Sequence, residues 1–403
     1  MKRFILIVLA VLVIFGAVAT YISLSQKPQE TAAPDALSQT PGSGTEAPTE
    51  TAAPVEIRKM DFDAIRALHG ADETVMSLGD ESVSWAEYCD WLGSTGRQIE
   101  NYFQQMAAFY GVAADWEGSV GDDSGMNFAQ YAVYETNENL SSILAYRNFV
   151  KEKQLSLSEQ EQEQLTDEAL AKSLLGESAT VEQLKTELES EGFGVETYRR
   201  IRETNLLLDK YYDETYGLNG EKVSDEAAVA FQEEAGYVSA AHILLRTIDP
   251  NTGEKLDEAV VEEKLLKAEE LARELRAIQD PAKREARFLE LKDEFCEDGG
   301  KLSYPNGYTY TPGTMVASFE EAAKALEPFE VSDPVESYYG YHVIMRLPLR
   351  PDSLLYSAQG TPTTARQETA VAGMNGELET FLSANPVTYA DSIEDLDLTK
   401  FIQ

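Results

Sequence analysis

The chain has 403 residues, which predicts two or three domains, and 43% of them are hydrophobic, enough to form buried cores. This composition excludes a chain that is disordered throughout. The formal net charge of −38 argues against a nucleic-acid partner, because phosphate backbones repel such an acidic protein. The two cysteines, Cys89 and Cys296, cannot form a disulfide framework or a cysteine-rich zinc site.

The N-terminus predicts an exported chain. Lys2 and Arg3 precede an uncharged run at residues 4–22, which as a helix would measure roughly 28 Å and cross the roughly 30 Å core of a bilayer. The basic pair favours an inner N-terminus, so residues 1–26 are expected to anchor an extracytoplasmic chain in the cell membrane. Small residues at 17–19 leave open a cleaved signal peptide and a secreted product. No cysteine follows the run closely, which excludes a lipoprotein anchor.

A linker is expected at residues 27–56. It holds five of the fifteen prolines and no aromatic residue, so it cannot bury enough apolar area to offset its ordering entropy. As a coil it would reach roughly 30 Å. Its simplest role is to hold the folded part away from a membrane or wall.

Residues 57–235 predict a mainly helical region. Gly79-Asp80 between short segments at residues 75–78 and 81–83 predicts a hairpin, and Ser84 with Glu87 predicts a capping box at the start of a helix. Helices are expected at 85–110, 128–153, 158–175, 180–190, 195–216 and 224–234. Aromatic residues recur at helical spacing, so most are expected in the core; the alternative is a hydrophobic groove for unfolded chains.

The pattern changes at residues 236–348, which predict a compact β-α-α-loop-α-β-β unit. Strands are expected at 238–245, 335–337 and 341–346, helices at 256–279, after Pro281 and at 319–326, and loops at 299–313. Residues 349–403 are expected to return to helix at about 364–383 and to end in an acidic tail.

Five short motifs of this unit, in this order, resemble the parvulin family of peptidyl-prolyl isomerases. They are Ala241-His242-Ile243-Leu244-Leu245, Phe295-Cys296-Glu297-Asp298-Gly299-Gly300, Met315-x-x-x-Phe319, Val331-Ser332-Asp333-Pro334-Val335 and Gly340-Tyr341-His342-Val343-Ile344. The resemblance covers about a quarter of the chain. It departs at the family's Gly-Gly-Asp-Leu-Gly turn, which here reads Gly299-Gly300-Lys301-Leu302-Ser303.

The resemblance implies an α+β fold, in which a small antiparallel sheet with surrounding helices is inserted in a mainly α-helical chaperone-like lobe. It also implies the site. His242 and His342 would form a hydrogen-bonded pair, with Asp298 beside the substrate carbonyl. Met315 and Phe319 would form the wall of the proline pocket, sharing a helical face if Met315 begins the helix. Cys296 is expected to have a supporting structural hydrogen bond.

Catalysis of rotation about an X–Pro bond requires few functional groups. Rotation about an X–Pro bond crosses a barrier of about 20 kcal/mol, and no bond is made or broken, so no nucleophile, metal or cofactor is expected. A pocket that grips the proline ring, sheds water and stabilises the twisted amide is sufficient.

Other interpretations remain. Strand histidines are more often core residues, Met315 and Phe319 could be plain core, and Asp298 could be a turn residue. No further zinc ligands lie at suitable spacing. A Ser–His–Asp triad lacks a Gly-x-Ser-x-Gly elbow. His69 is expected at the surface without a role, and no basic cluster that would select acidic substrates is apparent.

The order of segments resembles extracytoplasmic foldases of the PrsA and SurA type. This implies that residues 57–235 and 349–403 form one lobe around the isomerase unit. The leading hypothesis is a membrane-tethered isomerase and foldase for unfolded exported polypeptides with X–Pro bonds. The alternatives are an inactive holdase that binds unfolded secreted clients and, more remotely, a surface spacer protein. No oligomeric state is predicted.

Overall fold

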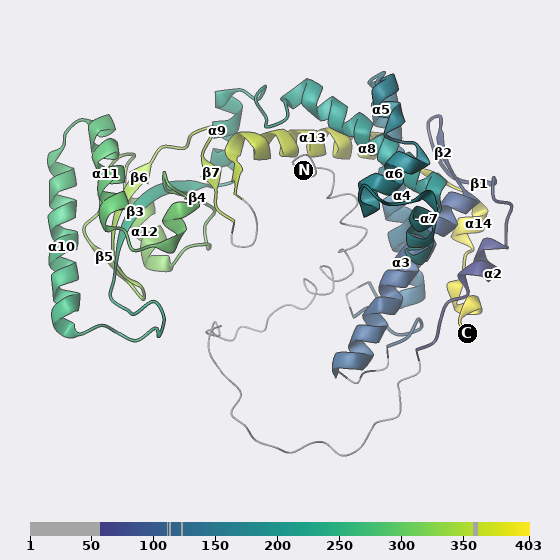
Figure 1. Ribbon diagram of the computed structural model, residues 1–403, viewed down its shortest axis with the longest axis horizontal. Coiled ribbons are helices and arrows are strands. Elements are labelled where there is room, and N and C mark those ends of the chain that lie inside the picture. Colours follow the sequence, from purple (N-terminus) through teal and green to yellow (C-terminus); the bar gives the residue numbers. More distant parts are fainter. Residues whose placement is uncertain (1–56, 111, 113, 122–123, 358–361) are drawn as a thin grey trace, which may run out of the picture. The chain divides into compact units, whose positions relative to one another are not determined.

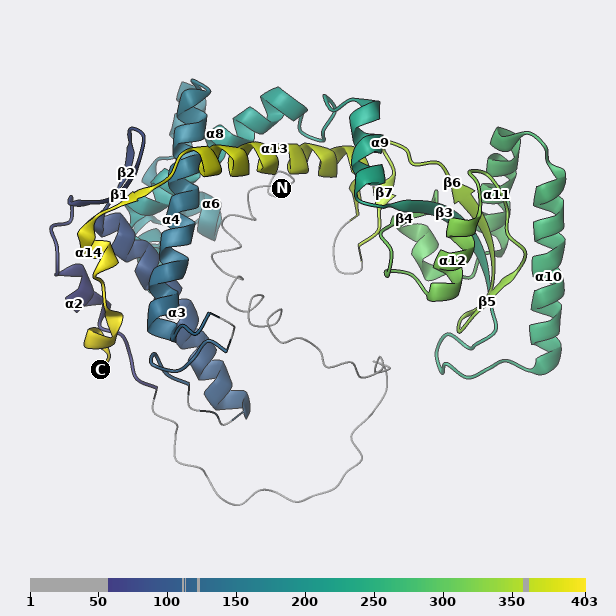
Figure 2. The same cartoon turned by 180° about the vertical axis from the view of Figure 1, so that it is seen from behind.

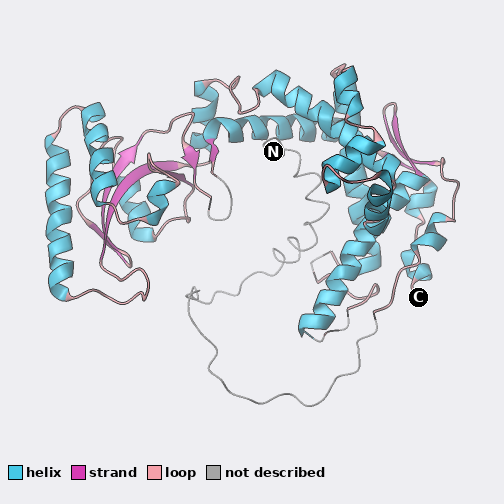
Figure 3. Ribbon diagram, viewed as in Figure 1, coloured by secondary structure: helices cyan, strands magenta, loops and turns pink. Residues whose placement is uncertain are grey.

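The computed structural model describes residues 57–403 except 111, 113, 122–123 and 358–361. The expected anchor and linker lie outside the described residues. None of the helices in the described part is long and apolar enough to cross a bilayer. The described chain is a mixture of helices and short strands, which confirms the α+β class (Figure 3).

The chain divides into two compact units. Unit 1 contains the residues up to Tyr211 together with Gly376–Gln403, and unit 2 is Tyr212–Asn375. The division falls within helices α8 (Val195–Tyr216) and α13 (Ala365–Ala384). The boundaries expected at residues 236 and 348 remain proposals about domains.

Unit 1 is mainly helical. Its elements are α2 (Phe62–Arg66), β1 (Thr74–Leu78), β2 (Glu81–Ser84), α3 (Trp85–Gln105), the π-helical turn η1 (Met106–Tyr110), α4 (Phe128–Glu152), α5 (Glu159–Glu163), α6 (Asp167–Leu175), α7 (Val181–Ser190), β9 (Thr388–Tyr389), α14 (Asp391–Glu394) and the 3-10 turn η3 (Leu398–Phe401). The predicted hairpin is confirmed, because β1 and β2 pair antiparallel. The single helix predicted at 158–175 is wrong, because Thr166 caps a new helix and the chain turns before it.

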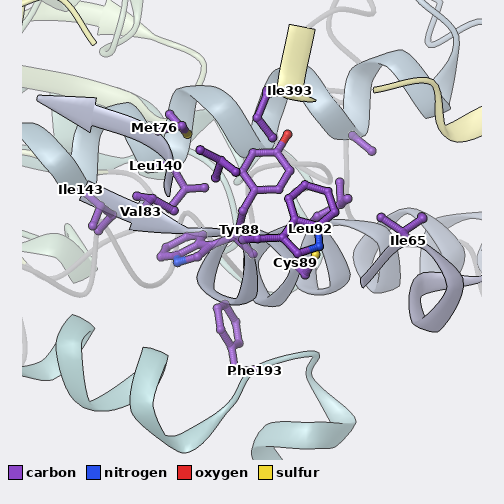
Figure 4. Close-up of a cluster of buried hydrophobic side chains, with 14 of the residues drawn as sticks. Ile65, Met76, Val83, Tyr88, Cys89, Leu92, Leu140, Ile143, Phe193 and Ile393 are labelled. Atoms are coloured by element: carbon purple, nitrogen blue, oxygen red, sulfur yellow. The ribbon is translucent and has the colours of Figure 1, made fainter. Parts of the chain in front are cut away.

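The C-terminal segment completes the core of unit 1. Strand β9 pairs antiparallel with β1, so the sheet order is β2-β1-β9. Ile393 of α14 packs in one cluster with Tyr88 and Leu92 of α3 (Figure 4). Burial of Trp85, Tyr88, Trp91, Phe103 and Trp116 confirms that most of the aromatic residues are core, whereas Phe109 is 79% exposed.

Unit 2 is built on a six-stranded sheet of order β5-β6-β3-β4-β7-β8. Its elements are α9 (Asp225–Glu234), β3 (Val238–Arg246), α10 (Glu258–Ala277), α11 (Pro281–Phe295), the 3-10 turn η2 (Gly299–Leu302), β4 (Tyr308–Tyr310), α12 (Ala317–Ala325), β5 (Val335–Ser337), β6 (Gly340–Leu347), β7 (Leu354–Leu355) and β8 (Thr363–Thr364). The strands and helices predicted for this unit are present with small shifts. The loop expected at 299–313 instead contains η2 and β4, and strands β7 and β8 were not predicted.

Two apolar clusters cover the two faces of this sheet. Helices α10 and α11 pack on the face that carries Ala241 and Ile243, and α12 packs on the face that carries Ala240 and Ile344 (Figures 1 and 2). Side chains of a strand alternate between faces, so His242 and His342 point to the α12 side. Gly340 starts β6 with φ +144°, and a Cβ there would lie 2.2 Å from the carbonyl oxygen of Leu245. A glycine is therefore required for β6 to run against β3.

Candidate isomerase site

The central strands bring the two histidines together. Strands β3 and β6 pair so that Leu244 lies opposite His342 and Ile344 lies opposite His242. The two imidazoles are therefore diagonal neighbours, stacked with centroids 5.1 Å apart and Nδ1 atoms 2.9 Å apart. Both side chains are buried.

Asp298 lies three residues after the end of α11 and is the N-cap residue of η2. Its Oδ1 accepts the backbone N–H of Gly300 at 3.1 Å. Its Oδ2 lies 2.9 Å from Nε2 of His242 and accepts the hydroxyl of Tyr308 at 2.5 Å. Burial alone would raise the pKa of this carboxyl, but the hydrogen bonds from His242 and Tyr308 outweigh it and hold the pKa well below its usual range. Asp298 is therefore an anionic acceptor that receives Nε2–H of His242.

Ser337 lies at the other side of the histidine pair. It ends β5, and its Oγ lies 2.7 Å from Nε2 of His342 and accepts the backbone N–H of Tyr339 at 3.1 Å. Burial, followed by the neighbouring His242, lowers the pKa of His342 to about 3, so His342 is neutral at pH 7.

The bonds form a chain with a defined direction when both rings are neutral. Ser337 donates to Nε2 of His342, and His342 donates through Nδ1–H to Nδ1 of His242. His242 then donates through Nε2–H to Asp298. A single arrangement of protons therefore satisfies both imidazoles, with the negative charge at one end.

Phe319 lies against both imidazoles. It is buried near the start of α12, with its ring 5.3 Å from that of His242 and 5.8 Å from that of His342 in edge contacts. Met315 is partly buried and packs on the same cluster as Phe319. It lies before α12, however, so the condition that Met315 begins the helix is not met. The backbone N–H of Met315 instead donates to the carboxylate of Glu320 at 2.9 Å, which fixes the turn.

Cys296 is the C-cap residue of α11 and is buried. Its Sγ accepts the backbone N–H of Leu244 at 3.4 Å, and burial raises the pKa of the thiol, which keeps it neutral. This contact ties the end of α11 to β3, next to the strand position of His242. In the described part of the chain, no group of three or more His, Cys, Asp or Glu side chains is arranged to hold a metal ion.

The structure adds residues that the sequence reasoning missed. Ser337 lies just before the Tyr338-Tyr339-Gly340 turn of a predicted hairpin, so its closeness to His342 could have been inferred from hairpin pairing. Tyr308 carried no such signal, because its segment was expected to be a loop. Glu320 was also missed; it accepts the backbone N–H groups of Gly313 and Met315.

Comparison with known proteins identifies the same part of the chain. Residues 242–347 match the family model described as "Rotamase: PPIC-type PPIASE domain". The chain is 28% identical over 187 residues to "Foldase protein PrsA 3" of Bacillus cereus, an alignment that covers 45% of this chain and 65% of that protein. It is 39% identical over 104 residues to "Chaperone SurA" of Chromohalobacter salexigens, covering 26% and 20% respectively.

The crystal structure of PrsA from Bacillus subtilis aligns over 82% of this chain and 93% of that chain, with 19% sequence identity and a TM-score of 0.24. That score is too low to define the arrangement of the whole chain. The chain also spans less than two thirds of the length of the curated relatives described above. The match to the family model nevertheless includes the histidine pair, Asp298, Met315 and Phe319. Residues 242–347 therefore form a parvulin-type, or PPIC-type, peptidyl-prolyl cis–trans isomerase domain.

Proposed function

We propose that the chain is a membrane-tethered, extracytoplasmic foldase that accelerates rotation of X–Pro bonds in unfolded exported polypeptides. The similarity to foldases and to a chaperone supports unfolded proteins as clients. The uncharged run at residues 4–22 supports the tether. The chain from residue 57 onwards would then act outside the membrane, with residues 27–56 as the linker.

In the proposed mechanism, each side chain of the site acts on a different part of the X–Pro substrate. Phe319 and Met315 would hold the prolyl ring and exclude water from the imide. Asp298 would lie beside the carbonyl of the X–Pro bond. A planar amide carries partial negative charge on its oxygen, and twisting removes the resonance that places it there. An anionic carboxylate near this oxygen thus disfavours the planar state more than the twisted one, which lowers the barrier.

The histidine pair would orient this carboxylate through a hydrogen bond, and neither imidazole would act as a nucleophile. Because His342 is neutral and Ser337 donates to it, His242 is left with Nε2–H directed at Asp298. The observation that carries the proposal is this chain of hydrogen bonds with the Phe319 ring in edge contact with both imidazoles.

The test is a protease-free prolyl tetrapeptide assay on the purified chain. We expect His242→Ala and Met315→Ala each to lower kcat/KM at least tenfold, which corresponds to about 1.4 kcal/mol of barrier. His69→Ala is the matched control, because this third histidine lies in unit 1, where it pairs with Glu73. Wild-type rates in both site variants, with folding verified by circular dichroism, would reject the isomerase site.

The same variants address the alternative of a holdase. Phe109 is 79% exposed and Leu218 is 49% exposed, so the chain offers apolar side chains to an unfolded client outside the isomerase site. Suppression of client aggregation that persists in His242→Ala and Met315→Ala would assign client binding to surfaces other than that site. A wild-type chain that suppresses aggregation without any isomerase activity would favour the inactive holdase.

A further inference from the structure

The hydroxyl of Tyr308 lies between the carboxylate of Asp298 and the backbone of Gly300. It donates to Oδ2, the oxygen that also receives Nε2–H of His242. Gly300 lies on the other side of this hydroxyl, and a Cβ at position 300 would lie 1.9 Å from the hydroxyl oxygen of Tyr308. Only glycine at position 300 leaves this space, so the local backbone and the tyrosine are fitted to each other.

A buried lysine fixes the backbone of the segment that precedes Tyr308. Lys292 of α11 is 1% exposed, and its Nζ donates to the carbonyl oxygens of Tyr304 and Pro305 at 2.8 and 2.6 Å. Burying an ammonium is costly unless it is hydrogen-bonded. These two bonds therefore fix the backbone just before β4.

The segment is held from the other side by residues beyond the matched family domain, which ends at residue 347. The backbone N–H of Tyr356 donates to the carbonyl of Thr309 at 2.7 Å, and β7 pairs parallel with β4. The ring of Tyr356 lies 5.5 Å from that of Tyr304 and 5.7 Å from that of Tyr308. Tyr308 is thus immobilised by parts of the chain on both sides.

We propose that Tyr308 is a positioning residue that orients the carboxylate of Asp298 toward His242 and so fixes the direction of the hydrogen-bond chain. Five titratable groups interact with this carboxylate: His242 from β3, Tyr308 from β4, His342 from β6, Lys292 from α11 and Cys296 directly after α11. Lys292 directs its bonds at carbonyl oxygens and Cys296 is neutral. The side-chain hydrogen bonds that orient Asp298 are therefore those of His242 and Tyr308. For catalysis, the proposal rests on the isomerase function proposed above.

Tyr308→Phe removes the hydroxyl and keeps the ring. We expect kcat/KM to fall about tenfold at pH 7 with KM unchanged, because a charge-assisted bond is lost while the pocket is intact. Tyr310→Phe is the matched control, two residues along the same strand, because its buried hydroxyl has no hydrogen-bond partner in the described part of the chain. Equal activity of Tyr308→Phe and wild type would overturn the catalytic part of the proposal.

Nuclear magnetic resonance of the full-length protein tests the positioning without any isomerase measurement. In the wild type, ¹⁵N shifts of His242 should report Nε2–H with unprotonated Nδ1, and the short Tyr308 bond should give a downfield hydroxyl proton. Tyr308→Phe should lose that proton and mix the His242 tautomers, whereas Tyr310→Phe should not. An unchanged His242 tautomer in Tyr308→Phe overturns the proposal. Wild-type spectra as expected but without isomerase activity would overturn the proposed function alone.

Gly300→Ala tests the same hydrogen bond, between Tyr308 and Asp298, by a change at the other residue that contacts the Tyr308 hydroxyl. Its methyl group would displace the Tyr308 hydroxyl, so we expect a loss of kcat/KM similar to that of Tyr308→Phe. In the Tyr308→Phe background the nearest ring atom, Cζ, is 3.1 Å from the added carbon, so the further loss should be small. Fully additive losses in the double variant would contradict a shared mechanism.

Discussion

The carboxylate of Asp298 accepts hydrogen bonds from three segments of the chain: His242 on β3, Tyr308 on β4 and Gly300 in η2. These donors keep the partly buried carboxylate charged, because burial by itself favours the protonated form. His342 is in the opposite situation. It is buried without a carboxylate in contact, and its pKa is lowered to about 3.

This difference predicts how His342 responds to acid. An unfolded histidine binds a proton below about pH 6.5, whereas native His342 resists protonation until about pH 3. The unfolded state therefore binds more protons in this window, and the free energy of unfolding falls as the pH drops from about 6.5 toward 3. We expect the ring resonances of His342 to be unchanged between pH 7.5 and 4.5 in the folded protein. A titration midpoint near pH 6 would show that burial does not control this imidazole.

Helix starts are the elements that local sequence determines most directly. Ser84, Ser158 and Thr180 cap helices as their side-chain chemistry predicts. Thr166 also caps a helix, and it divides the segment that hydrophobic pattern alone assigned to one helix. The hydroxyl of Thr166 accepts the N–H of Ala169, so a cap inside a periodic pattern can end the preceding helix.

The long helix α4 offers a quantitative test of capping. Asn127 accepts the backbone N–H of Gln130 at 2.8 Å, and the side chain of Gln130 accepts the N–H of Asn127 at 3.1 Å. We expect Asn127→Ala to lower the free energy of unfolding of unit 1 by about 1 kcal/mol, because both halves of this box are weakened. Urea denaturation followed by tryptophan fluorescence measures it, since all three tryptophans lie in unit 1.

Asn127→Asp is the control for this prediction. It retains the acceptor and adds a negative charge at a helix N-terminus, where the helix dipole favours it. Stability equal to or above the wild type is expected. If the aspartate variant were as unstable as the alanine variant, the loss would not arise from the cap.

Strands β4 and β7 show the limit of local reasoning about elements. Tyr308–Tyr310 is three residues long in a segment rich in Gly and Pro, which is typical of a loop. It becomes a strand because it pairs with β3, about seventy residues earlier, and with β7, which follows later. No pattern within the segment encodes these partners.

The whole molecule consists of two compact units and an N-terminal segment beyond the described residues. Unit 1 has its own core, which includes the C-terminal residues Ile393 and Leu398. Unit 2 has a sheet with a separate cluster on each face. The candidate isomerase residues described above all belong to unit 2.

The proposed membrane tether is testable at this scale. We expect the full-length chain, expressed in its source cells, to sediment with the membrane fraction and to be digested by protease added outside. A form in which a cleavable signal peptide replaces residues 1–26 should be recovered in the soluble exported fraction. Recovery of the full-length chain as a soluble exported protein shortened at its N-terminus would instead support the cleaved signal peptide.

The sequence by itself determined the α+β class, most helix positions, the central strands and the motifs that carry both histidines, Asp298, Met315 and Phe319. The element positions follow from short-range signals such as caps and periodicity, whereas the α+β class and the site motifs follow from the resemblance to the parvulin family. Tertiary structure alone decided that Tyr308 reaches Asp298, that Lys292 holds the preceding loop and that strands β7 and β8 extend the sheet. Such contacts join residues distant in sequence, and their free energy comes from burial and pairing in the folded state, which no local pattern records.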